Sequence, residues 1–206
     1  MSILNIHVSP ELTRIYVDTL IHRTTSADRA GTYQHGEKMF VLPQANLIVA
    51  GRGDVVLLGH LTAALATLTP EGYDAAMMGM DYVLNDEVPA YEAVREMHGH
   101  APLQGLEFVV AGWSASADAC AATRWERWEG QQSFNAMPVA PWSLSPDAGT
   151  GQPDEPDTIE KVSAYARAQL RRLGSLTGAV GGRLLLAELT RDGVTTRTVT
   201  DLSEMH

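Results

Sequence analysis

Residues 3–18 read Ile-Leu-Asn-Ile-His-Val-Ser-Pro-Glu-Leu-Thr-Arg-Ile-Tyr-Val-Asp. β-Branched and aromatic residues are frequent on both sides of Pro10-Glu11, and such residues favour strands. A short polar break between two runs of this kind is typical of a β-hairpin. We therefore expect strands over 3–9 and 12–18, with the second strand ending on Asp18.

The stretch 38–54 predicts two further strands and the start of a helix. Apolar runs over 38–42 and 46–50 are separated by Pro43-Gln44. Asp54 follows these runs and is a suitable N-cap for a helix, because apolar residues recur after it at the three- and four-residue spacing of a helix face. Residues 22–36, between the first two pairs of strands, are polar and contain glycine, so we expect a loop there.

The rest of the chain alternates between helix and strand signals. The expected elements are a helical region over 73–97 interrupted near Pro89, strands over 106–112 and 122–128, a helix from Asp157 to Gly174, and a hairpin over 184–189 and 194–199. The helix would open on a capping box formed by Asp157 and Glu160, and the hairpin would turn at Asp192-Gly193. Strand runs separated by helix runs indicate an α+β protein, with residues 1–206 forming a single domain.

Composition excludes several classes of function. The 206 residues carry 15 Lys and Arg against 25 Asp and Glu, a formal net charge of -10. Nucleic acid and anionic membrane surfaces are therefore poor partners, because they would repel the chain. Cys120 is the single cysteine, no apolar run reaches membrane-spanning length, and the first ten residues lack the pattern of a signal peptide. We expect a soluble, cytoplasmic protein.

Four motifs together resemble the proteasome β-subunit family and its bacterial relatives, which are N-terminal-nucleophile (Ntn) hydrolases. They are Tyr16-Val17-Asp18 at the end of the first hairpin, Lys38-Met39-Phe40 leading to Ala50-Gly51-Arg52-Gly53-Asp54, Phe108-Val109-Val110-Ala111-Gly112-Trp113, and the helix from Asp157 followed by Gly181-Gly182 and Asp192-Gly193. Together the four motifs cover nearly the whole chain, and their order and spacing carry the resemblance. The resemblance implies a four-layer αββα sandwich.

The resemblance also implies a nucleophile at the start of the mature chain. Ser2 takes that place once Met1 is removed, and its own α-amine, with an unperturbed pKa of about 8, can act as the base. Asp18 lies sixteen residues after Ser2, which is the spacing of nucleophile and aspartate in the family. Lys38 is similar to the family's lysine, which pairs with that aspartate and favours the deprotonated nucleophile.

Two further positions follow from the same resemblance. Gly51 is similar to the glycine whose N–H helps to bind the oxyanion, and Ser143 is matched to the supporting serine. The positions of a second supporting Asp and Ser hold Thr177 and Val180 instead, and Val180 has no side-chain hydrogen-bonding group.

Two functions therefore stay open at this point. The first is an Ntn peptidase or amidohydrolase, for which the resemblance implies a homo-oligomeric ring and unfolded peptide as substrate. The second is a catalytically silent assembly or scaffold subunit, in which Asp18 and Lys38 form only a structural ion pair. Neither function calls for a cofactor, and His98 and His100 lack the additional ligands that a metal site requires.

Overall fold

The computed structural model of the chain describes residues 2–23, 32–103, 105–147, 155–177 and 181–202. Its elements, in chain order, are β1 (Leu4–Val8), β2 (Thr13–Asp18), β3 (Leu20–Arg23), β4 (Thr32–His35), β5 (Met39–Leu42), the 3-10 turn η1 (Pro43–Ala45), β6 (Leu47–Arg52), α1 (Val55–Thr67), α2 (Tyr73–Met97), β7 (Gly105–Ser114), β8 (Ala119–Trp128), β9 (Asn135–Pro138), β10 (Trp142–Ser145), α3 (Ile159–Thr177), β11 (Arg183–Thr190) and β12 (Gly193–Asp201).

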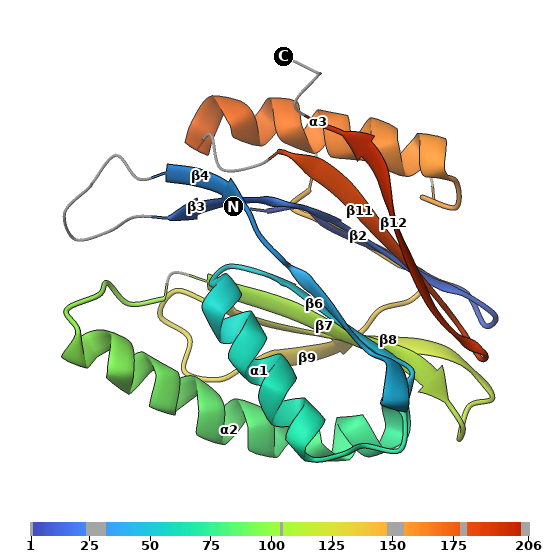
Figure 1. Ribbon diagram of the computed structural model, residues 1–206, viewed down its shortest axis with the longest axis horizontal. Coiled ribbons are helices and arrows are strands. Elements are labelled where there is room, and N and C mark those ends of the chain that lie inside the picture. Colours follow the sequence, from blue (N-terminus) through green and yellow to red (C-terminus); the bar gives the residue numbers. More distant parts are fainter. Residues whose placement is uncertain (1, 24–31, 104, 148–154, 178–180, 203–206) are drawn as a thin grey trace.

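These elements form four layers (Figure 1). One antiparallel sheet has the order β10-β1-β2-β11-β12, and the other has the order β5-β6-β7-β8-β9. Figure 1 shows α3 covering the outer face of the first sheet and α1 with α2 covering the outer face of the second. The predicted α+β, four-layer αββα sandwich is confirmed.

Three hydrophobic cores correspond to the three spaces between the layers. The side chains of strand β6 contribute to two of these cores. Leu47 and Val49 enter the core under α1 and α2, whereas Ile48 and Ala50 enter the core between the sheets. Because successive side chains of a strand point to opposite faces, a strand covered on both faces must be apolar throughout. This is why 47–50 and 108–111 are continuous apolar runs.

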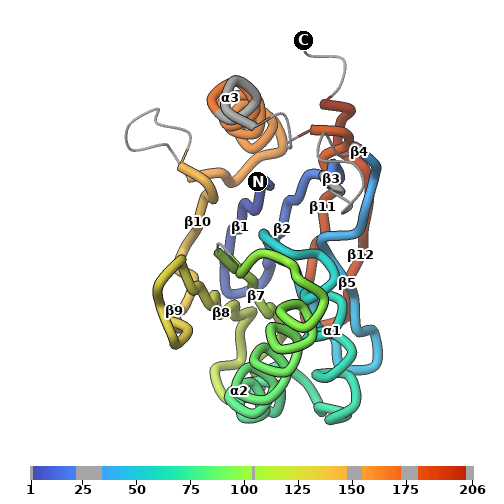
Figure 2. Tube along the Cα trace, turned by 90° about the vertical axis from the view of Figure 1, so that its left-hand side faces the viewer, coloured from blue at the N-terminus to red at the C-terminus, as the bar shows by residue number. Residues whose placement is uncertain are grey.

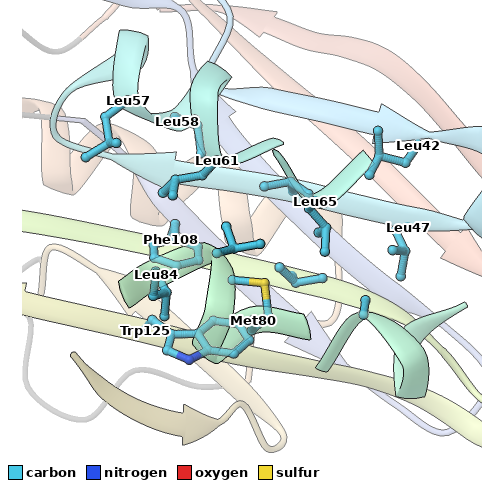
Figure 3. Close-up of a cluster of buried hydrophobic side chains, with 14 of the residues drawn as sticks. Leu42, Leu47, Leu57, Leu58, Leu61, Leu65, Met80, Leu84, Phe108 and Trp125 are labelled. Carbon is cyan, nitrogen blue, oxygen red and sulfur yellow. The ribbon is translucent and has the colours of Figure 1, made fainter. Parts of the chain in front are cut away.

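The core beneath the two helices combines leucine side chains with aromatic rings (Figure 3). Leu57, Leu61 and Leu65 project from α1 at the spacing of one helix face. The rings of Phe108 and Trp125 stack below them, with centroids 5.3 Å apart and an interplanar angle of 11°. Packing of α1 and α2 against β6, β7 and β8 therefore rests on this apolar face.

The start of α1 agrees with the sequence, since Asp54 caps it. Its carboxylate accepts hydrogen bonds from the N–H groups of Val56 and Leu57 at 2.9 and 3.1 Å. The expected interruption of the next helix at Pro89 is wrong, because α2 runs through it from Tyr73 to Met97. Pro89 lies on the exposed side of the helix. Proline has no N–H to bond to the backbone carbonyl four residues earlier, and water can solvate that carbonyl here.

Three other expectations need correction. Thr158, not Asp157, caps α3: its hydroxyl accepts a hydrogen bond from the N–H of Lys161 at 3.2 Å, and the helix begins at Ile159. The helix also continues beyond Gly174 to Thr177. Within the expected loop 22–36, β3 and β4 pair as a two-stranded sheet, which lacks the hydrophobic periodicity that would reveal it.

The first and last hairpins of the chain are confirmed. Strands β1 and β2 pair antiparallel, as do β11 and β12, and β2 then pairs with β11 so that the two chain ends share one sheet. No helix in the described part of the chain is long and apolar enough to cross a membrane.

Ile48 provides a test of the core between the sheets. It is fully buried there, so Ile48→Ala should lower the free energy of unfolding by about 2–5 kcal/mol, because it loses apolar burial and leaves a cavity. Val56→Ala is the control, since Val56 is 55% exposed and its truncation should change stability by about 0.5 kcal/mol or less. Urea denaturation of both variants measures the difference, and equal losses would contradict the layered packing.

Candidate active site

The centre of the candidate site is a buried ion pair between Asp18 and Lys38. Asp18 is the last residue of β2, and Lys38 directly precedes β5, so the pair joins the two sheets. The Lys38 Nζ atom lies 2.9 Å from Asp18 Oδ2, and both side chains are 1% exposed or less. Lys38 Nζ also donates to the carbonyl of Leu20 at 2.5 Å.

Backbone groups complete the surroundings of the aspartate. The N–H of Ile3 donates to Asp18 Oδ1 at 2.7 Å, and the N–H of Gly181 donates to Oδ2 at 3.1 Å. With Lys38, three donors therefore hold one carboxylate. They fix the start of β1 and the residues before β11 to the end of β2.

Burial shifts both members of the pair in the direction that disfavours charge. It raises the pKa of Asp18, and the charge of Lys38 and the N–H donors oppose that rise. It lowers the pKa of Lys38; the charge of Asp18 opposes this fall, whereas nearby Arg52 adds to it. The three donors on the carboxylate, including the 2.9 Å contact with Lys38, favour the ionised forms against this effect of burial. The site thus holds a lysine charge in surroundings that disfavour it.

Ser2 precedes the residue that binds Asp18 and is 5% exposed. The residue after it, Ile3, is bonded through its N–H to Asp18. Leu4 and Ile6 of β1 face the core between the sheets, and continuing that alternation by two residues puts Ser2 on the same side. The sequence-predicted residues Ser2, Asp18 and Lys38 are therefore brought together at one end of the sandwich.

Gly51 lies near the end of β6, next to Lys38. Its N–H donates to the carbonyl of Lys38 at 3.0 Å, so this donor already has a partner. A Cβ atom at Gly51 would come within 2.9 Å of the carbonyl oxygen of Glu107 and within 3.1 Å of Leu58 and Phe108. Only glycine fits between β7 and α1 at this point.

A shallow depression begins at the same glycine. The end of β6, the start of α1 and the start of β7 surround it. Its walls are Gly51, Arg52, Gly53, Asp54, Val55, Leu57, Leu58, Leu61, Leu106, Glu107 and Phe108. Most of these side chains are apolar, so the depression suits a small apolar group.

Ser143 lies farther from Ser2 than the sequence match implies. It pairs with Ile6 in the β1–β10 register, whereas Ser145 pairs with Leu4 and is nearer to the N-terminal end. The hydroxyl of Ser143 accepts a hydrogen bond from Arg124 Nη1 at 2.6 Å. Val180 and the side chain of Thr177 lie outside the described residues.

A second buried ionic cluster adjoins the ion pair, and none of the sequence motifs predicted it. Glu107 of β7 is 2% exposed and accepts from Arg52 Nη1 at 2.8 Å, from Arg124 Nη1 at 3.4 Å and from the Ser145 hydroxyl at 2.5 Å. Arg52 also donates to the Ser145 hydroxyl. One signal was present in the sequence: Glu107 is the single charged residue in the apolar run 106–113.

His98 and His100 lie away from this site. The rings of His98 and His100 lie 6.5 Å apart at the end of α2. Across the described ranges, no group of three or more His, Cys, Asp or Glu side chains is arranged to hold a metal ion.

Two stacked antiparallel sheets between helical layers, with an Asp–Lys pair buried beside the N-terminal residues, define a proteasome-like β-subunit fold. Anbu from Yersinia bercovieri, described as an ancestral beta-subunit, shares this fold with a TM-score of 0.61 and 11% identity, over 99% of this chain and 89% of that chain. Anbu from Hyphomicrobium sp. strain MC1 gives a TM-score of 0.60 and 12% identity, over 97% and 88% of the two chains.

A Gly-1 mutant of the Hyphomicrobium protein is similar as well, with a TM-score of 0.58, 12% identity, and 97% and 87% of the two chains covered. No protein-family model and no curated protein matches the sequence. The predicted resemblance to proteasome-like β-subunits is thus confirmed in the fold.

The ion pair makes a testable contribution to stability. Lys38→Met should lower the free energy of unfolding by about 3–5 kcal/mol at neutral pH, because it leaves Asp18 buried without its partner. The double variant Asp18→Asn, Lys38→Met should recover most of that loss, since it removes both charges. Because burial raises the pKa of Asp18, the loss in the single variant should shrink as the pH falls and the carboxylate is protonated. Urea denaturation at pH 5 and pH 8 measures this; a loss that does not depend on pH would contradict it.

Proposed function

We propose that this chain is a proteasome-like Ntn hydrolase that cleaves peptide amide bonds, with Ser2 as nucleophile after removal of Met1. The observation that carries the proposal is the buried Asp18–Lys38 pair, which binds the N–H of Ile3 directly behind Ser2. A fold by itself does not define an activity, so the proposal rests on the site. Isolated charges are rarely buried without a function or a close structural partner.

The reaction follows from the groups at the start of the chain. The Ser2 hydroxyl attacks the amide carbon, and its proton passes to the α-amine of the same residue. The resulting ammonium returns the proton to the leaving amine as the C–N bond breaks, which leaves an ester on Ser2. Water then gives a proton to the α-amine and attacks the ester, and the carboxylic acid product leaves with the hydroxyl regenerated.

Lys38 and Asp18 would support these steps by charge and by position. The ammonium of Lys38 stabilises the deprotonated forms of both the hydroxyl and the amine of Ser2. Asp18 holds Lys38 in place and fixes the backbone after Ser2 through Ile3.

The expected assembly is a homo-oligomer, in a ring or in stacked rings, that acts on unfolded peptide in the cytoplasm. The support is the likeness of fold to Anbu β-subunits. The enclosed chamber of such a ring would admit flexible, unfolded chains and exclude folded proteins. Sedimentation of the purified protein tests this part of the proposal.

Hydrolysis tests the assignment of the nucleophile. Protein whose intact mass shows loss of Met1 should cleave an unfolded polypeptide, and Ser2→Ala should reduce the rate by a factor of about 100 or more, because nucleophile and base are lost together. Ser2→Thr should keep activity, since it retains both the hydroxyl and the α-amine. Ser9→Ala is the matched control, because Ser9 lies in the β1–β2 turn. Cleavage that persists in Ser2→Ala would exclude Ser2.

A second candidate function is a silent assembly subunit. It is favoured by the N–H of Gly51, which is engaged by the carbonyl of Lys38 and would need to change partner before it could bind an oxyanion. This candidate predicts a defined oligomer that lacks hydrolytic activity even when Ser2 carries a free amine. The same purified protein distinguishes the two candidates.

A further inference from the structure

The second ionic cluster consists of Arg52, Glu107, Arg124 and Ser145. It is polar, unlike most of the residues between the sheets. That space is otherwise filled by apolar side chains from both sheets. The cluster occupies only the end where Asp18, Lys38 and Ser2 lie. In Figures 1 and 2 the N-terminal end of the chain lies on the side where β7 begins, and Glu107 is near that end of β7.

Strand register connects this cluster to Ser2. Ser145 pairs with Leu4, and Ser2 lies two residues before Leu4 on the same strand face. Two residues of extended chain span roughly 7 Å, so Ser2 lies about that far along the chain from the residue that pairs with Ser145. Arg52 in turn is close enough to Lys38 to lower the pKa of that lysine. Register and this coupling therefore put both ion pairs at the end of the sandwich where the chain starts.

The Ser145 hydroxyl has a fixed orientation within the cluster. It donates its proton to Glu107 Oε2 and accepts from Arg52 Nη1. A hydroxyl offers one donor and two acceptor lone pairs, so one lone pair remains for a further N–H donor. The arrangement holds an acceptor, together with a carboxylate and a guanidinium, near the start of β1.

Several ionisable groups lie on, or next to, the strands that meet at this end of the sandwich. They are Asp18 on β2, His35 on β4, Lys38 before β5, Arg52 on β6, Glu107 on β7, Arg124 and Glu126 on β8, and Asp147 after β10. His35 is bonded to Thr19, and Arg124 Nη2 lies 3.5 Å from Glu126, which is partly exposed. Of these groups, Arg52 and Glu107 are the pair that hydrogen-bonds to the Ser145 hydroxyl.

We propose that the Arg52–Glu107 pair sets the protonation of the Ser2 α-amine, and this inference rests on the proposed function in that Ser2 is the N-terminal residue. The carboxylate favours the ammonium form and the guanidinium favours the neutral amine. The neutral amine is the form that accepts the hydroxyl proton, so the balance of the two charges decides the pH at which the site becomes active. Arg52 and Glu107 are positioning and tuning residues, which act through Ser2 and do not touch the substrate.

The two members of the pair should shift the amine in opposite directions. Glu107→Gln should lower the pKa of the Ser2 amine, and Arg52→Gln should raise it, each by roughly half a unit to one unit for charges at this range. Arg124→Gln should raise it as well, because Arg124 also contacts Glu107. The probe is limiting acetic anhydride: the pH dependence of Ser2 acetylation, followed by mass spectrometry of the N-terminal peptide, gives the pKa without requiring any hydrolysis.

Glu188→Gln is the matched control. Glu188 is also a carboxylate bonded to two arginines, Arg14 and Arg197, but it belongs to β11 and bonds to the residue of β2 four positions before Asp18. Its substitution should leave the Ser2 amine unchanged. If Glu107→Gln does not fold, the half-buried Arg124 provides the variant that carries the test.

The outcomes separate this inference from the function on which it rests. Opposite shifts of the amine support the tuning role, and the acid limb of the pH profile for kcat/KM should move with them. Folded variants with an unchanged amine, or with shifts of the same sign, overturn it and leave a structural role only. A protein that shows the opposite shifts but cleaves no peptide would refute the hydrolase proposal while leaving the electrostatic inference intact.

Discussion

The salt bridge between Lys38 and Asp18 is the interaction on which the rest of the site depends. Through it, the end of β2 is joined to the start of β5, and the same carboxylate binds the N–H groups of Ile3 and Gly181. Four segments that are distant in sequence therefore meet at one buried carboxylate. Replacing such a pair by apolar groups is often harmless to stability, whereas removing one partner alone is costly.

The two ends of the space between the sheets have different physical properties. Most of that space is apolar and holds the layers together by burial. The end near the chain's N-terminus instead contains two buried ion pairs, Asp18–Lys38 and Glu107–Arg52. Charges in a site of low dielectric interact strongly with one another and with any amine or hydroxyl between them. The sandwich thus provides a rigid apolar frame for a small charged site.

The fold is shared with Anbu proteins although only 11% to 12% of the residues are identical. Physical requirements explain how this is possible. Each layer needs apolar residues of suitable volume on the correct faces, and many sequences satisfy that condition. The requirements at the site are narrower: Gly51 must lack a side chain where β7 approaches, and Asp18 and Lys38 must meet across the two sheets. The proposed activity therefore depends on these few positions more than on the shared fold.

The sequence by itself predicted most of the helices and strands and an α+β order, because periodicity, caps and turn residues are local signals. The four-layer arrangement and the choice of Asp18 and Lys38 came from the resemblance of its motifs to proteasome β-subunits. Only the tertiary structure decided that Ser145 lies nearer to Ser2 than Ser143 does, that Gly51 donates to Lys38, and that Glu107 meets Arg52. These are contacts between strands far apart in the chain, and strand register and the packing of two sheets fix them. No local pattern of residues carries that information.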